Sequence, residues 1–212
     1  MKKRIVCFGD SLTWGADPAG GPRLEERWPL VLQDELGSGY TVIEEGLGGR
    51  TIAADDPVEG EKNGLRQILP CLETHSPFDL LIVMLGTNDC KRKYNYSDLD
   101  IAWGMERFLE KVFLHRHFRA EDGYQMLLIA PPPINEGIQH SPLGDLFAFE
   151  EGRARSKHLA DSFRPLAERF GCRFMDAAQY AHSSPIDGIH MDAVNETRLA
   201  HAIAERVREM LE

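Results

Sequence analysis

The feature that most constrains the fold of this chain is a regular alternation between short, continuously apolar segments and longer segments with helical periodicity. The apolar segments do not alternate with polar residues, which is typical of parallel strands buried on both faces. Five such strands are predicted, at residues 5–8, 41–43, 80–85, 126–130 and 173–175. Helices are predicted beside them at about 26–36, 65–74, 98–117, 149–170 and 193–211.

This alternation predicts one α/β domain spanning residues 1–212, a three-layer sandwich of five parallel strands with helices on both faces. A chain of 212 residues is long enough to bury roughly 70% of its unfolded surface without disulfides or a structural metal. In the last helix, the 3.6-residue period places Val194 and Leu199 on the apolar face and Glu196 elsewhere. Asp192 is placed to cap its N-terminus.

The charge balance bears on the partners of the chain. A formal net charge of −10 repels a phosphate backbone, and the short basic run Lys91-Arg92-Lys93 is typical of a solvated loop. We therefore expect no nucleic-acid partner. No apolar run is long enough for a membrane span, and the N-terminal one is too short for a signal peptide. The expected location is the cytoplasm, without a membrane partner.

The four cysteines are far apart and show no CxxC spacing. This pattern favours neither a zinc site nor a disulfide framework. We accordingly expect no metal and no cofactor.

Small polar residues follow the predicted strands where each one ends. Ser11 comes after the first strand, Gly48 and Gly49 after the second, Asn88 after the third, and Asp187 and His190 after the last. Because the carboxyl ends of parallel strands share one edge of a sheet, these residues are expected to meet there.

Their types match acyl transfer from a serine. Ser11 can attack a carbonyl, His190 can take its proton, and Asp187 can hold the histidine tautomer. The backbone N–H groups of Ser11 and Gly49 and the amide of Asn88 can stabilise an oxyanion.

Four sequence blocks, in order, resemble those of the GDSL, or SGNH, hydrolase family. They are FGDSLTWG at 8–15, GLGGRT at 46–51, GTND at 86–89 and DGIH at 187–190. The segments IEEGL at 43–47, LPCL at 69–72 and PPP at 131–133 are similar to the arylesterase and acyltransferase (perhydrolase-like) branch. Two positions depart from common family patterns: Glu45 stands where many relatives carry Asn, and Met191 where Pro is frequent.

The resemblance implies a flavodoxin-like fold, with Ser11 as nucleophile and Asp187 and His190 as its partners. It also implies an oxyanion hole formed by Ser11, Gly49 and Asn88, in which Gly48 is the alternative to Gly49.

Other residues near these blocks admit two readings. Trp14 and Ile189 flank the nucleophile and the base, where they could form apolar walls of a pocket for an acyl group or pack beneath the loops. Arg50 could contact a substrate carbonyl or pair with Asp55, Asp56 or Asp89. Asp10 is expected to bind loop backbone. The long loop at 131–144 is expected to shape the pocket and is a candidate contact surface for a homo-oligomer.

The leading functional hypothesis is a serine esterase that hydrolyses short-chain acetyl or aryl esters through an acyl-enzyme on Ser11. Acyl transfer to an alcohol or peroxide is an extension of the same chemistry. The alternative from another class is a flavin- or nucleotide-binding module, because a fold does not determine a function. The glycines at 46–49 lack the usual phosphate-binding spacing, and a phosphate loop does not require the Asp187–His190 turn.

Overall fold

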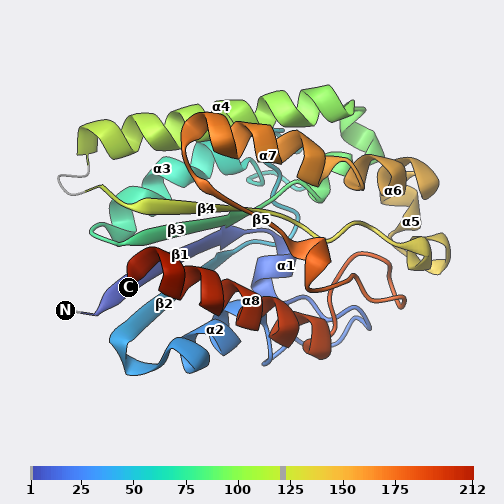
Figure 1. Cartoon of the computed structure of the whole chain (residues 1–212). Helices are drawn as coiled ribbons and strands as arrows, with labels where there is room; N and C mark the ends of the chain where they lie inside the picture. Colours follow the sequence, from blue (N-terminus) through green and yellow to red (C-terminus); the bar gives the residue numbers. More distant parts are fainter. Residues whose placement is uncertain (1, 120–122) are drawn as a thin grey trace.

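The computed structural model describes residues 2–119 and 123–212 and shows one five-stranded parallel sheet between two layers of helices (Figure 1). The strands are β1 (Lys3–Gly9), β2 (Tyr40–Gly46), β3 (Leu80–Met84), β4 (Gln125–Ala130) and β5 (Arg173–Asp176). Their order is β2-β1-β3-β4-β5, which is the flavodoxin-like order. The predicted fold class is therefore confirmed.

The two faces of the sheet bury separate apolar cores, because successive strand residues point to opposite sides. In β1, Val6 and Phe8 face one core, while Ile5 and Cys7 face the other. On the first face pack α3 (Gly64–His75), α4 (Asp98–Arg119) and α7 (Leu159–Phe170), and on the second face pack α2 (Trp28–Leu36) and α8 (Ala193–Leu211) (Figure 1).

The sheet order reverses at β1, which lies between β2 and β3. Gly9, the last residue of β1, pairs with Gly46 of β2 on one side and Met84 of β3 on the other. The loops that follow these three strands therefore leave from the same edge, next to the reversal point where α/β sheets bind ligands.

Strand β2 is longer than the 41–43 predicted from the apolar run, because it includes Glu44 and Glu45. As an edge strand it is only partly buried along its whole length. Glu44 forms ion pairs with Arg23 and Arg27, at 2.6 and 2.5 Å. Partial exposure and these cations allow charged residues to continue an edge strand.

The single helix predicted at 149–170 is wrong: the segment forms α6 (Glu150–Ser156) and α7, separated by a turn. The hydroxyl of Ser156 accepts from the Ile134 N–H at 2.9 Å, so the end of α6 is held against the loop after β4. That loop also contains the short helix α5 (Gly144–Phe147).

Helix α8 also differs from its predicted face. Val194 is 58% exposed, whereas Glu196 is completely buried. The Glu196 carboxylate accepts from the N–H of Trp28 at 2.8 Å, so it caps the N-terminus of α2 from the neighbouring helix. Asp192 does cap α8, by accepting from Asn195 N–H at 2.9 Å.

No helix in the described ranges is both long and apolar enough to cross a membrane.

Candidate active site

Ser11 is held at the start of the short helix α1 (Ser11–Trp14), directly after β1. The Asp10 side chain caps this helix by accepting from the Leu12 N–H at 2.9 Å. At Gly9 a Cβ atom would lie 1.9 Å from the Thr13 hydroxyl. A glycine is therefore required where the chain turns from β1 into α1, and the Ser11 hydroxyl is placed at the sheet edge.

The three residues proposed to act together from the sequence are in hydrogen-bond contact. His190 Nε2 lies 2.9 Å from Ser11 Oγ, and His190 Nδ1 lies 2.5 Å from Asp187 Oδ2. The side chains of His190 and Asp187 are 14% and 7% exposed. With the ring proton on Nδ1, the histidine donates to Asp187 and can accept the serine proton at Nε2.

The turn that carries Asp187 and His190 is held from two directions. Asp187 Oδ1 accepts from the N–H groups of Ile189 and His190, both at 2.9 Å. Gly188 has φ +78°, and its carbonyl accepts from the Asn135 N–H at 2.9 Å. A Cβ at Gly188 would lie 2.2 Å from the backbone nitrogen of Ile138.

The loop after β4 thus packs directly on the catalytic turn. Asn135 is a positioning residue that the sequence analysis did not single out. Its side chain accepts from Gly137 N–H and donates to the Ser183 carbonyl, at 2.8 and 2.6 Å. The available signal was an Asn shortly after a proline run, a type that often binds its own loop backbone.

The proposed oxyanion donors surround the same edge. Gly49 has φ +80°, a conformation that favours glycine. The N–H groups of Gly48 and Gly49 have no acceptor among residues 2–119 and 123–212, and Ser11 presents a first-turn helix N–H that has no partner within the helix. The choice between the two glycines stays a prediction, with the backbone conformation favouring Gly49.

The side-chain amide of Asn88 already donates two hydrogen bonds within the protein. Its Nδ2 donates to Asp10 Oδ2 and to the Arg50 carbonyl, both at 3.1 Å. These bonds fix the direction of the amide. An oxyanion would therefore share a hydrogen with one of these acceptors.

Two buried carboxylates lie behind these loops. Burial raises the pKa of Asp10 to about 6, although the hydrogen bond from Leu12 and the charges of His190 and Arg50 lower it. Burial raises the pKa of Asp89 to about 7, against the lowering effect of the hydrogen bond from Ile52. Both carboxylates bind loop groups, as expected of Asp10.

The raised pKa of Asp89 predicts a pH-dependent stability. Between about pH 4 and 7 the Asp89 carboxyl binds a proton in the folded protein but not in the unfolded chain. Its contribution to the free energy of unfolding is therefore fully present below about pH 4 and is lost as the pH rises through 7. We expect Asp89→Asn to remove this loss. Between pH 5 and pH 8, the free energy of unfolding of wild type is expected to fall by about 2–3 kcal/mol more than that of Asp89→Asn. Urea unfolding at several pH values measures the difference, and parallel curves would contradict it.

Arg50 does not make the predicted pair with Asp55, Asp56 or Asp89, and its contact with a substrate carbonyl stays a prediction. It is 5% exposed, and its guanidinium lies 4.0 Å from the ring centre of Phe8. It donates to Gln67 at 2.7 Å, to the Gly9 carbonyl at 2.6 Å and to the Glu45 carbonyl. Burial lowers its pKa to about 10. Arg50 therefore ties the loop after β2 to the end of β1, and forms no ion pair with Asp55, Asp56 or Asp89.

The two residues predicted to line a pocket for the acyl group, Trp14 and Ile189, differ in exposure. Trp14 is 38% exposed, and Arg23 stacks on its ring. Ile189 is 3% exposed and packs in the core on the α3, α4 and α7 face. Their contact with a substrate stays a prediction.

The chain is similar to a known family and to several solved structures. The model of the GDSL-like lipase/acylhydrolase family matches residues 7–195. The aryl esterase of M. smegmatis is 38% identical, with a TM-score of 0.89 and coverage of 99% of this chain and 100% of that one. The carbohydrate acetylesterase Est24 from Sinorhizobium meliloti is 35% identical, with a TM-score of 0.90 and the same coverage.

A carbohydrate acetylesterase family member from Sinorhizobium meliloti is 38% identical, with a TM-score of 0.87 and coverage of 99% of each chain. A search of the curated proteins found no match. The family match spans most of the sequence, and relatives of at least 35% identity share the whole fold; the chain therefore belongs to the GDSL-like lipase/acylhydrolase family.

Proposed function

We propose that this carboxylic ester hydrolase acts on short-chain acetyl or aryl esters through an acyl-enzyme on Ser11. The observation that carries the proposal is the chain of contacts from Ser11 Oγ through the His190 ring to Asp187, at 2.9 and 2.5 Å. A serine hydroxyl gains nucleophilicity when a positioned base can take its proton. The relatives support an esterase activity because all three of those described above carry an esterase name.

In the first step, Ser11 Oγ attacks the ester carbonyl while its proton passes to His190 Nε2. Asp187 stabilises the resulting imidazolium without taking its proton. The negative charge on the carbonyl oxygen is met by the N–H groups of Ser11 and Gly49 and by the Asn88 amide. Collapse of this intermediate breaks the ester bond, and His190 gives its proton to the leaving alcohol.

In the second step, water attacks the acyl group on Ser11. His190 takes a proton from this water, and then returns it to Ser11 Oγ as the carboxylic acid leaves. Acyl transfer uses the same intermediate, with an alcohol or peroxide replacing water. The test of transfer is the ratio of ester product to acid product at low alcohol concentration, and pure hydrolysis would contradict it.

The substrate class is tested with p-nitrophenyl esters from acetate to palmitate, together with acetylated sugars. We expect kcat/KM to be highest for acetate or a similarly short chain, because the relatives include an aryl esterase and two carbohydrate acetylesterases. A maximum at palmitate would contradict the proposed short acyl pocket. Activity on acetylated sugars would favour the carbohydrate esters named for two of the relatives.

Asn88→Ala is expected to lower kcat by about 10² to 10³-fold, with a smaller change in KM. The amide would stabilise charge that develops only in the transition state, and loss of one such donor has an effect of this size. Kinetics on p-nitrophenyl acetate measure it.

Thr87→Val is the matched control for Asn88→Ala. The neighbouring Thr87 side chain is buried, and its hydroxyl has no hydrogen-bond partner in the described part of the chain. We expect the control to keep wild-type kcat. Equal kcat for Asn88→Ala and wild type would remove Asn88 from the oxyanion hole.

The family membership leaves the flavin- or nucleotide-binding alternative without specific support. Homo-oligomer formation and a cytoplasmic location stay predictions.

A further inference from the structure

A second group of reactive side chains lies behind the active-site loops, on the face of the sheet covered by α3. Glu45 is near the end of β2, and Cys71 and His75 are on α3. One ligand atom from each residue lies within 4.8 Å of those of the other two. None of the three belongs to the proposed esterase mechanism.

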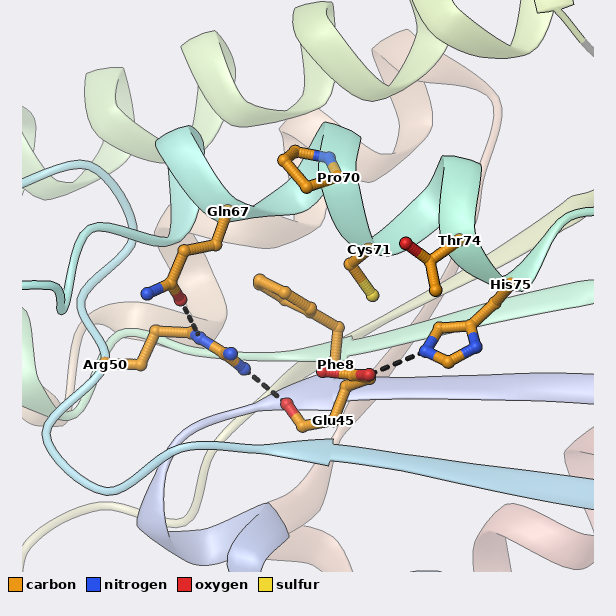
Figure 2. A pocket seen from close by; sticks show the side chains of 8 residues that line it. All are labelled: Phe8, Glu45, Arg50, Gln67, Pro70, Cys71, Thr74 and His75. Carbon is orange, nitrogen blue, oxygen red and sulfur yellow. Dashed lines mark hydrogen bonds and ion pairs between the residues drawn. The ribbon is translucent and has the colours of Figure 1, made fainter.

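Figure 2 shows how helix and strand bring these residues together. Cys71 and His75 are four residues apart, so they share one face of α3. Glu45 reaches this face from β2, and His75 Nε2 lies 2.6 Å from Glu45 Oε1. All three line a cavity of about 340 Å³, which Phe8 and Arg50 also line.

We propose that Glu45, Cys71 and His75 form a binding site for one divalent ion of the zinc type. A thiolate, an imidazole and a carboxylate are all established zinc ligands, and three protein ligands with one open position are an ordinary arrangement. Ligand pairs with the i, i+4 spacing on a helix also occur in metal sites. The cavity provides room for water as a fourth ligand.

Binding of a metal ion would require small shifts of the three ligand atoms. Zinc bonds to sulfur and nitrogen are about 2.3 and 2.0 Å long, so ligands in a tetrahedral shell lie roughly 3.5 Å apart. The His75–Glu45 contact would open from 2.6 Å, and pairs near the 4.8 Å limit would approach by about 1 Å. Rotation of the half-buried side chains can supply shifts of this size.

The thiol also selects the kind of metal. A bound ion must displace the proton of the Cys71 thiol, and zinc-type ions that prefer thiolate do so more readily than magnesium or calcium, which prefer oxygen ligands.

Arg50 connects this site with the active-site loops. Its guanidinium donates to the carbonyls of Glu45 and Gly9, and its own carbonyl accepts from Asn88. The negative charge of Glu45 favours the Arg50 cation. A bound dication would neutralise Glu45 and repel Arg50, so we expect occupation of the site to disturb the Ser11 and Asn88 loops and lower kcat.

The test measures metal binding to the whole chain, first with zinc by calorimetry and then with Co²⁺ by absorption. Wild type is expected to bind one equivalent, and the cobalt form to show thiolate-to-metal charge transfer. Cys71→Ser and His75→Ala are each expected to weaken zinc binding at least about 100-fold, since even residues behind metal ligands change affinity by 10 to 100-fold.

Matched controls separate this site from other thiols and histidines. Cys172→Ser removes another half-buried free thiol, and His201→Ala removes another histidine paired with a glutamate. Both controls are expected to bind zinc as wild type does. All four variants are expected to hydrolyse p-nitrophenyl acetate normally without metal, which also verifies their folding.

Activity provides the second readout. Saturating zinc is expected to lower wild-type kcat at least about 5-fold, the low end of coupling between two sites, and to leave Cys71→Ser unaffected. Ser11→Ala is expected to bind zinc normally, so failure of the proposed esterase function is distinguishable from failure of this site.

Absence of zinc binding, or equal binding by wild type, Cys71→Ser and His75→Ala, would overturn the site. The Glu45–His75 pair would then serve only to fasten α3 to β2. Binding without loss of kcat would overturn the link through Arg50.

Discussion

Ser11→Ala is expected to lower kcat/KM for p-nitrophenyl acetate by about 10⁴ to 10⁶-fold while the protein remains folded. The variant loses the only atom of this residue that could form the acyl-enzyme, and serine hydrolases that lose their nucleophile show effects of this size. The oxyanion donors and the substrate site remain, so a small residual rate above that in water is expected.

The measurement compares steady-state rates and thermal unfolding of the two proteins. Ser97→Ala is a suitable control, because Ser97 is an exposed residue whose hydroxyl donates to Asp100 at the start of α4 and takes no part in the Ser11–His190–Asp187 contacts. A second readout is the mass of wild type after reaction with an arylsulfonyl fluoride, which should add one group at Ser11. Wild-type activity in Ser11→Ala would refute the serine mechanism.

Asp187→Asn is expected to lower kcat by about 10⁴-fold. The new amide oxygen can still accept from the N–H groups of Ile189 and His190, as Asp187 Oδ1 does, so the turn is preserved. The amide nitrogen would then face His190 Nδ1 in place of the carboxylate oxygen at 2.5 Å. Because both would be donors, the histidine would take the tautomer that cannot accept the proton of Ser11.

Asp176→Asn is the control for a general effect of removing a loop carboxylate. Asp176 accepts from Ala178 N–H at the end of β5 and takes no part in the Ser11–His190–Asp187 contacts. Its kcat is expected to match wild type. A loss of less than about 10-fold in Asp187→Asn would mean that solvent or another group orients His190.

Much of the fold could be predicted from local sequence patterns. The five apolar runs identified all five strands, and the signal was clearest in the central strands β1, β3 and β4, where burial on both faces demands a continuous apolar run. The errors arise where tertiary contacts override local pattern. Glu196 is buried despite its charge, because it caps α2, a helix that begins 168 residues earlier.

In the candidate site too, some residues could be predicted from sequence motifs and others depended on tertiary contacts. The motifs placed Ser11, Asp187 and His190 at strand ends without knowledge of distances. The aspartate pair considered for Arg50 was wrong, because the fold surrounds its guanidinium with backbone carbonyls and Phe8. The Glu45–Cys71–His75 group was also missed, since its residues belong to two different elements.

The sequence by itself determined the α/β class, the parallel strands and the position of each chemistry-bearing segment after a strand, because these depend on periodicity and short-range spacing. The tertiary structure alone decided which atoms meet. Ser11 and His190 are 179 residues apart in the chain, and their contact depends on the packing of loops from opposite ends of the sequence. The same holds for the Glu45–Cys71–His75 group, because its formation requires α3 to pack beside β2.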